Sequence, residues 1–218
     1  MSADERDLPR LLLLTDRSQL RLGRGLVRTV RECAEVGLTH VVVREHDLVP
    51  DARSALVRAL ADVPGLDVIT SRIPDPVAVG IHLPADPAGS AVSTWSATRC
   101  TAGEAARTPR YRWRGRSCHS AEEVRRAAAD GADYVTFSPF AKSASKPGHG
   151  PPVDPEAFSG GVERVHGVGI PVFALGGITV DNAASARAVG AHGVAVMGEV
   201  MRSVDPAETT ARLLAAIG

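Results

Sequence analysis

The sequence predicts an α/β protein, a single-domain (β/α)8 barrel of the TIM type. Short apolar runs rich in leucine and valine alternate with alanine- and arginine-rich runs that have a helical period. Near-continuous apolar strands separated by helices are typical of a parallel sheet covered by helices on its faces. The chain has 218 residues, which suits a short barrel of eight strand–helix units.

An N-terminal tail is expected at residues 1–10 and a barrel domain at 11–218. Eight strands and six helices account for most of this domain. The strands are expected at 11–14, 41–43, 68–69, 80–83, before and up to His119, 134–137, 172–175 and 193–197. The helices are expected at 22–36, 51–62, 121–130, 155–167, 181–190 and 206–217. Residues 84–110 and 139–155 are rich in proline and small residues and predict long loops, the first with a short helix or strand.

An open, doubly wound sheet is the alternative fold. Such sheets commonly carry a glycine-rich phosphate loop after the first strand. Neither GxGxxG nor GxxxxGK[ST] follows residues 11–14, so the closed barrel is favoured.

The balanced charge of the chain argues against partners that bind through a strong overall electrostatic field, such as nucleic acid and anionic membranes. Lys+Arg number 25 and Asp+Glu number 25, giving a formal net charge of +0. A balanced chain has no global attraction to nucleic acid or to an anionic membrane, so any anion site must be local. Barrels of this kind often pair, which leaves a homodimer open.

The cysteines and the N-terminal residues predict a cytoplasmic protein. Cys33, Cys100 and Cys118 have no metal-ligand spacing, and the first ten residues are mostly polar. The apolar run 11–14 is far too short to span a bilayer.

A histidine at the end of the fifth expected strand is the leading catalytic candidate. Side chains alternate along a strand, so Ser117 and His119 share one face and Cys118 takes the other. The carboxyl ends of barrel strands line active sites, where an imidazole beside a hydroxyl suits proton transfer. A histidine that merely ties down a neighbouring loop is the alternative.

Glycine turns after the last two strands predict a phosphate site. Gly176 and Gly177 end the seventh strand, and Met197 and Gly198 end the eighth. Their backbone N–H groups can approach an anion closely, and barrels commonly hold phosphate at these two loops. Relief of crowding in tight turns is the simpler explanation.

Two basic residues are candidates for binding an anionic group of the substrate. Arg44 ends the second strand on the same face as Val42, where its guanidinium can bind a carboxylate or phosphate. The alternative is that Arg44 forms a buried structural ion pair with Glu45 or Asp16. Lys146 lies in a glycine- and serine-rich loop that fits a mobile lid, although a solvated loop without ligand contact is an alternative there.

The sequence offers little to a metal ion. The third strand ends in Thr70-Ser71-Arg72, and Asp75 and Asp86 have no acidic partner at a convincing spacing. We therefore expect neither metal nor cofactor.

Taken together, these residues resemble the family of thiamin phosphate synthase and its relative, the TenI-type thiazole tautomerase. The resemblance covers nearly the whole chain, because several weak motifs occur in the right order. They are Leu14-Thr15-Asp16, Val43-Arg44-Glu45, His82-Leu83-Pro84, Gly115-Arg116-Ser117-Cys118-His119-Ser120, Gly131-Ala132-Asp133-Tyr134-Val135, Ile170-Pro171-Val172, Gly176-Gly177-Ile178 and Gly190-Ala191-His192-Gly193-Val194-Ala195-Val196-Met197.

Departures from the synthase pattern point to the tautomerase branch. Val42 and His46 stand where synthases have glutamine and lysine. Thr70-Ser71-Arg72 replaces an Asn-Asp-Arg motif whose aspartate binds Mg²⁺, and Pro84-Ala85-Asp86-Pro87 replaces a second metal-binding motif. The resemblance thus implies a lost Mg²⁺–diphosphate site and a retained thiazole-phosphate site.

The resulting hypothesis is a metal-independent thiazole tautomerase of thiamin biosynthesis, acting on a carboxythiazole phosphate. The resemblance assigns proton transfer to His119, with Ser117, Arg44 and Lys146 holding the substrate. The alternatives are an active Mg²⁺-dependent synthase, a non-catalytic binding protein for thiazole or thiamin phosphate, and a barrel isomerase for another phosphorylated substrate. Cys118 as a nucleophile is disfavoured because strand alternation aims it away from the site.

Overall fold

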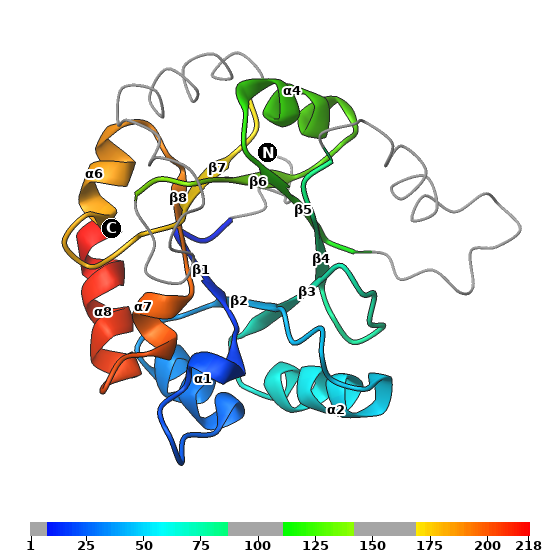
Figure 1. The fold of residues 1–218 in the computed structure, drawn as a ribbon, viewed down its shortest axis with the longest axis vertical. Coiled ribbons are helices and arrows are strands. Elements are labelled where there is room, and N and C mark those ends of the chain that lie inside the picture. Colours follow the sequence, from blue (N-terminus) through cyan, green and yellow to red (C-terminus); the bar gives the residue numbers. More distant parts are fainter. Residues whose placement is uncertain (1–7, 87–110, 142–168) are drawn as a thin grey trace, which may run out of the picture.

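The computed structural model describes residues 8–86, 111–141 and 169–218, and these residues form a closed barrel (Figure 1). The eight strands pair in the order β1-β2-β3-β4-β5-β6-β7-β8, and β8 closes on β1. Every pairing is parallel, as in the register Leu13↔Val41 between β1 and β2. The predicted fold class is therefore confirmed.

The strands are short and the helices lie between them along the chain. The strands are β1 Leu11–Leu14, β2 His40–Val43, β3 Asp67–Ser71, β4 Gly80–Leu83, β5 Trp113–Cys118, β6 Tyr134–Phe137, β7 Val172–Leu175 and β8 Gly193–Val196. The helices are the 3₁₀ helix η1 Arg17–Gln19 and the α-helices α1 Leu26–Glu35, α2 Pro50–Ala61, α4 Ala121–Ala129, α6 Ala183–Ala188, α7 Gly198–Met201 and α8 Pro206–Ile217.

The helices surround the strands on the outside of the barrel (Figure 1). Capping residues fix where several of them begin. Asp205 accepts a hydrogen bond from the N–H of Glu208 at 2.9 Å, and Pro206 follows at the first helical position of α8. None of the helices in the described ranges combines the length and apolar character that a membrane crossing requires.

Element boundaries differ from the sequence expectation where glycine or a tight turn intervenes. The first helix was expected from residue 22, but it begins at Leu26 because Gly23 has φ 83° and Gly25 is its extended N-cap. The fifth strand ends at Cys118, one residue before His119. Past β8, residues 198–201 form the short helix α7 where only a glycine turn was expected.

Some expectations lie outside the described residues. They concern most of the loop at 84–110, the helix at 155–167, and the lid loop with Lys146.

Strand alternation separates two cores. One lies between the strands and the helices and includes Cys33, Cys118 and Val135. The other fills the inside of the barrel, with Leu12, Trp113 and other apolar side chains of the strands. Apolar side chains thus fill much of the interior, from Trp113 at the start of β5 to Leu14 at the end of β1.

Adding a methyl group at Gly193 should destabilise the fold. A Cβ there would collide with the carbonyl oxygen of Arg10 and lie 2.9 Å from the ring of Phe173. We expect Gly193→Ala to lower the free energy of unfolding by about 1–3 kcal/mol in urea unfolding. Gly25→Ala is the control, because its Cβ would meet nothing within 4 Å. Equal losses in both variants would contradict the packing argument.

Candidate active site

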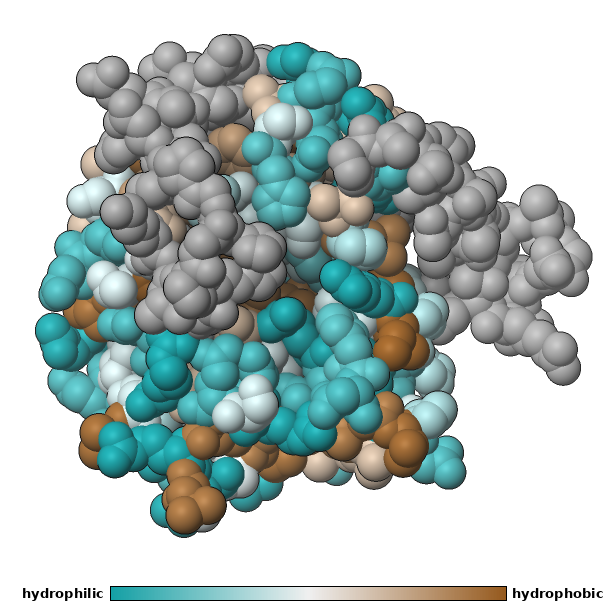
Figure 2. Space-filling view, in the orientation of Figure 1, coloured by the Kyte–Doolittle hydropathy of each residue, from teal (hydrophilic) through white to brown (hydrophobic). Residues whose placement is uncertain are grey.

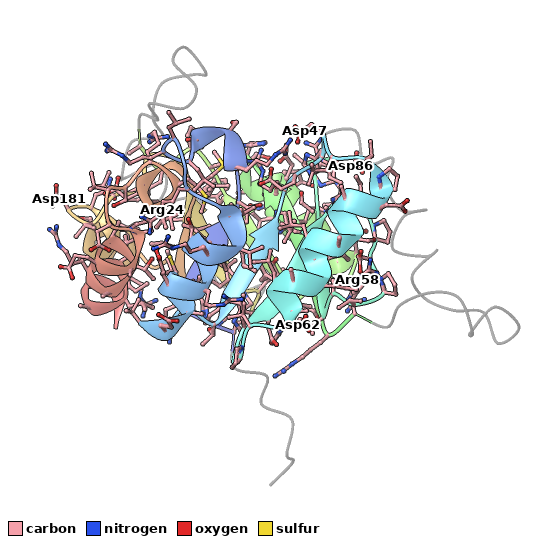
Figure 3. The ribbon with its side chains drawn as sticks, turned by 90° about the horizontal axis from the view of Figure 1, so that it is seen from below. Arg24, Asp47, Arg58, Asp62, Asp86 and Asp181 are labelled. Carbon is pink, nitrogen blue, oxygen red and sulfur yellow. The ribbon has the colours of Figure 1, made fainter. Side chains whose placement is uncertain are left out.

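All eight strands end at one rim of the barrel. In the side view of Figure 3, Asp47 and Asp86 follow the ends of β2 and β4 and lie at one end of the molecule, whereas Arg58 and Asp62 at the end of α2 lie at the other. The rim therefore gathers residues that are distant in sequence. It collects Arg44, Ser117, His119, Gly176, Gly177, Met197 and Gly198 of the predicted site, while Lys146 lies outside the described residues.

His119 is held in place by the start of α4. Ser120 accepts from the N–H of Glu123 at 3.2 Å, and Glu123 Oε2 accepts from the N–H of His119 at 2.7 Å. The imidazole Nδ1 lies 3.0 Å from the carbonyl oxygen of Ser138. Ser138 Oγ lies 3.1 Å from the same nitrogen, so the described contacts of the ring are both made by Nδ1. His119 is exposed, and its Nε2, which bonds to none of the described residues, is placed to exchange a proton or a hydrogen bond with a substrate.

Cys118 points away from the site, as the alternation predicts. Its side chain is fully buried in the core between strands and helices. Burial raises the pKa of the Cys118 thiol to about 12, so a thiolate nucleophile is disfavoured at neutral pH.

Ser117 faces the barrel interior, where it meets a histidine that the sequence reasoning gave no role. Nε2 of His82 lies 3.0 Å from Ser117 Oγ, and Nδ1 of His82 lies 3.2 Å from the hydroxyl of Tyr134. His82 is buried, and its burial, with the charges of Arg44 and Arg116, lowers its pKa to about 3. His82 is therefore neutral in the working pH range. An apolar strand interrupted by an inward-facing histidine was the signal in the sequence.

Arg44 reaches the rim without the structural ion pair considered above. Within the described ranges it forms no ion pair with Glu45 or Asp16, because Glu45 binds Arg17 at 2.8 Å. Arg44 Nη1 lies 2.6 Å from Met197 Sδ. Burial opposes ionisation of Asp16, but hydrogen bonds from Ser18 and Gln19 and the charge of Arg44 outweigh it and lower the pKa of Asp16. The guanidinium of Arg44 thus remains available to an anion.

Further basic groups surround Arg44 at the ends of β2 and β3. Burial and the nearby charges of Arg72, Arg44 and Arg53 lower the pKa of His46. Arg53 is buried and donates to the carbonyl oxygens of Val43, Ser71 and Ile73, at 3.3 to 3.4 Å. We call Arg44, His46 and Arg72 the basic cluster. Figure 2 faces this rim and shows a largely hydrophilic surface beside β2 and β3.

The turn after β7 has the backbone that an anion site requires. Gly176 and Gly177 have φ of 93° and 66°, values that residues other than glycine rarely adopt. Their N–H groups donate to none of the described residues. Asn182 Nδ2 donates to the carbonyl of Gly177 at 2.8 Å, and its Oδ1 accepts from the N–H of Thr179 at 2.8 Å. This amide holds the turn in shape.

The turn after β8 combines backbone and a basic side chain. A Cβ at Gly198 would collide with the guanidinium of Arg202, which therefore lies against this turn. Glu199 Oε1 accepts from the N–H of Val180 at 3.3 Å and joins the two turns. Arg202 was not singled out from the sequence, because only the short helix α7 brings it back over Gly198.

The described residues do not fit a Mg²⁺ site. Such a site needs carboxylates at the strand ends, whereas β3 ends in Ser71 and is followed by Arg72. Asp75 accepts from Ser54 Oγ at 2.7 Å, and Asp86 lies 3.8 Å from Arg116. No group of three or more His, Cys, Asp or Glu residues in the described ranges could hold a metal ion.

A family model described as thiamine monophosphate synthase matches residues 11–200. The chain belongs to this family. The resemblance stated from the sequence is thus confirmed, and the protein takes its place in a family of thiamin biosynthesis.

Individual relatives agree with this assignment. A putative thiamine-phosphate synthase from Geobacter sulfurreducens is 34% identical over 205 residues, covering 94% of this chain and 92% of that protein. A thiamine-phosphate synthase from Haloarcula marismortui is 30% identical over 215 residues, covering 94% and 95% of the two chains. The solved thiamine phosphate pyrophosphorylase from Pyrococcus furiosus has a TM-score of 0.75 at 25% identity and covers 95% of both chains.

These comparisons favour a different reaction from the one first expected. The relatives named here are synthases or pyrophosphorylases, and none supports the tautomerase hypothesis. The synthase alternative is thus better supported than the tautomerase. The departures at Val42, His46 and Thr70-Ser71-Arg72 still occur within the family.

Burial of neutral His82 should make the fold sensitive to acid. Its folded-state pKa of about 3 lies below the ordinary 6.5, so the unfolded chain binds a proton in this window that the folded chain does not. Stability is therefore present above pH 6.5 and falls as the pH drops toward 3. From pH 7 to 5 the His82 contribution is roughly 2 kcal/mol. Urea unfolding of wild type and His82→Gln at both pH values measures it, and equal pH slopes would contradict the assignment.

Proposed function

We propose that the protein is an enzyme of thiamin biosynthesis that catalyses the coupling reaction of the thiamine-phosphate synthases. In that reaction the nitrogen of a thiazole phosphate attacks the methylene carbon of a pyrimidine diphosphate. The new C–N bond forms as the C–O bond to diphosphate breaks, and diphosphate leaves with the electron pair. The names of the relatives support this reaction over isomerisation.

Two anion-binding arcs at one rim are the observation that carries the proposal. The basic cluster lies at the ends of β2 and β3, and the glycine turns with Arg202 lie at the ends of β7 and β8. Arg44 touches Met197, so the two arcs meet. Two phosphorylated reactants need two such sites close together, with their reactive atoms in contact.

The chain's own residues then have distinct roles. The guanidinium groups of Arg44 and Arg72 stabilise the charge that develops on the departing diphosphate. N–H groups of Gly176, Gly177 and the Met197-Gly198 turn hold the thiazole phosphate. Ser117 near the end of β5 and His119 just after this strand lie at the same rim and orient the bound rings. Because the residues after β3 do not suit Mg²⁺, no step is assigned to a metal.

Tautomerisation of a carboxythiazole phosphate is the second candidate. The observation that favours it is the exposed imidazole of His119, whose Nε2 bonds to none of the described residues and can move a proton between ring positions. In that reaction Arg44 would hold the substrate carboxylate. Coupling needs no proton transfer at His119, so the two reactions differ in how much they depend on this residue.

A paired assay distinguishes the two reactions. Purified protein is given pyrimidine diphosphate and thiazole phosphate, with Mg²⁺ and with EDTA, and separately carboxythiazole phosphate in EDTA. We expect thiamin phosphate and diphosphate from the first mixture, with His119→Asn reducing the rate less than tenfold. Conversion only of carboxythiazole phosphate, lost in His119→Asn by about 10²–10⁴-fold, would establish the tautomerase. Tight binding without either product would indicate a binding protein.

Removing Arg44 tests the division of the rim into two arcs. Loss of a charge-assisted contact worth about 1.5–3 kcal/mol should weaken binding of the pyrimidine diphosphate by about 10- to 100-fold in Arg44→Ala, as measured by calorimetry. Arg44→Lys should recover part of the affinity, because it keeps the charge without the planar fork. Thiazole phosphate should bind both variants as it binds wild type. A parallel loss for both ligands would place Arg44 at a single shared site.

A further inference from the structure

A chain of polar groups runs through the inside of the barrel beneath Ser117. It begins at the hydroxyl of Tyr134 on β6, passes through both ring nitrogens of His82 on β4, and ends at Ser117 Oγ on β5. Tyr134 and His82 are buried, and Ser117 is half-buried. The chain therefore leads from the sealed interior to the rim where substrate is proposed to bind.

Gly115 makes room for this chain. In the strand register Gly115 is the partner of His82 on one side and of Tyr134 on the other. A Cβ at this position would overlap the Tyr134 ring and Nδ1 of His82. The two rings stack across the vacant position with centroids 5.6 Å apart. The contact between His82 and Tyr134 therefore depends on three neighbouring strands, β4, β5 and β6.

The positions of the protons follow from counting donors and acceptors. In the described part of the chain, His82 Nδ1 is the hydrogen-bond partner of the Tyr134 hydroxyl. A buried O–H needs an acceptor, so Tyr134 donates to Nδ1. Neutral His82 then carries its proton on Nε2 and donates it to Ser117 Oγ at 3.0 Å. Thr136 Oγ1, at 3.5 Å from Nε2, is a more distant second acceptor.

We propose that Tyr134 and His82 are positioning residues that fix the polarity of Ser117, so that its hydroxyl donates to an acceptor atom of the bound substrate. Ser117 Oγ accepts the hydrogen bond from the Nε2–H of His82 and directs its own O–H toward the rim. The group above Ser117 is then a phosphate or carboxylate oxygen or an unprotonated ring nitrogen, and an N–H group is rejected. The identity of that ligand rests on the proposed function, whereas the state of His82 does not.

The opposite proton arrangement is disfavoured by the same count. If Nδ1 carried the proton, the Tyr134 hydroxyl would lack an acceptor in the described interior. Ser117 would donate to Nε2 and offer only lone pairs to the substrate. Protonation of both nitrogens is excluded at neutral pH, since burial and the charges of Arg44 and Arg116 lower the His82 pKa to about 3.

Nitrogen NMR of the ligand-free protein tests the proton positions directly. Histidines are labelled with ¹⁵N, and the His82 signals are identified by their loss in His82→Gln. We expect a protonated Nε2 and an unprotonated Nδ1, unchanged between pH 6 and 8. A protonated Nδ1 in wild type would overturn the proposal, whatever reaction the enzyme catalyses.

Removing the Tyr134 hydroxyl tests its role as a positioning group. In Tyr134→Phe we expect the two His82 nitrogens to lose their fixed assignment and thiazole phosphate to bind about tenfold more weakly, by one lost hydrogen bond. Tyr111→Phe is the matched control, because the Tyr111 hydroxyl accepts from the N–H of Asp75 at 3.1 Å, away from Ser117. Tyr134→Phe with wild-type nitrogen signals would overturn the proposal.

A double-mutant cycle separates positioning from general destabilisation. In a Ser117→Ala background, Tyr134→Phe should cause no further loss of binding, since there is no hydroxyl left to orient. A second tenfold loss in that background would show that Tyr134 acts on the fold and not through Ser117. If wild type fails to bind thiazole phosphate while the NMR result holds, the proposed function fails and the assignment of His82 stands.

Discussion

Closure of the barrel is the constraint on which the rest of the structure depends. Eight parallel strands of four to six residues leave no edge, so every second side chain must point into a narrow interior. That alternation decides that Ser117 faces inward and Cys118 outward. It also brings the carboxyl ends of all strands to one rim, which is how Arg44, His119 and Gly176 become neighbours of a single site.

The polar groups inside the barrel hold a side chain near the rim, Ser117, in position. Burying a histidine without partners is unfavourable, but His82 has a partner at each nitrogen. Gly115 supplies the space and Tyr134 the donor, and both belong to strands adjacent to one another in the barrel. A network that is fully hydrogen-bonded has little freedom to rearrange, so it can hold Ser117 in one orientation.

The sequence predicted the eight strands and most of the helices, because apolar runs and turn glycines are local signals. It also placed Ser117, His119 and the two glycine turns correctly at strand ends. It missed contacts that only closure creates: the His82–Tyr134 stack across Gly115, and Arg202 lying over Gly198. The pairing of Arg17 with Glu45, which frees Arg44, joins residues 28 apart in sequence, and no local pattern indicates it. The changes at Val42, His46 and the two metal-binding motifs favoured the tautomerase branch, whereas the named relatives support the synthase alternative better.

The arginines that this chain shares with the family pattern, Arg44 and Arg72, keep the charge of the rim positive although the metal-binding motifs have changed. A divalent metal ion places positive charge directly on the oxygens of a diphosphate. At the end of β3 this chain has Arg72, beside His46 and Arg44, with the buried Arg53 beneath the strand ends. Guanidinium groups bind phosphate oxygens with a fixed fork and a permanent charge. The rim therefore keeps a positive potential at the place where a diphosphate would leave, although the donor set for a divalent cation is absent from the described residues. A tautomerase that holds one carboxylate would need only one of these guanidinium groups, whereas a departing diphosphate can use both Arg44 and Arg72, and this difference supports the proposed coupling reaction.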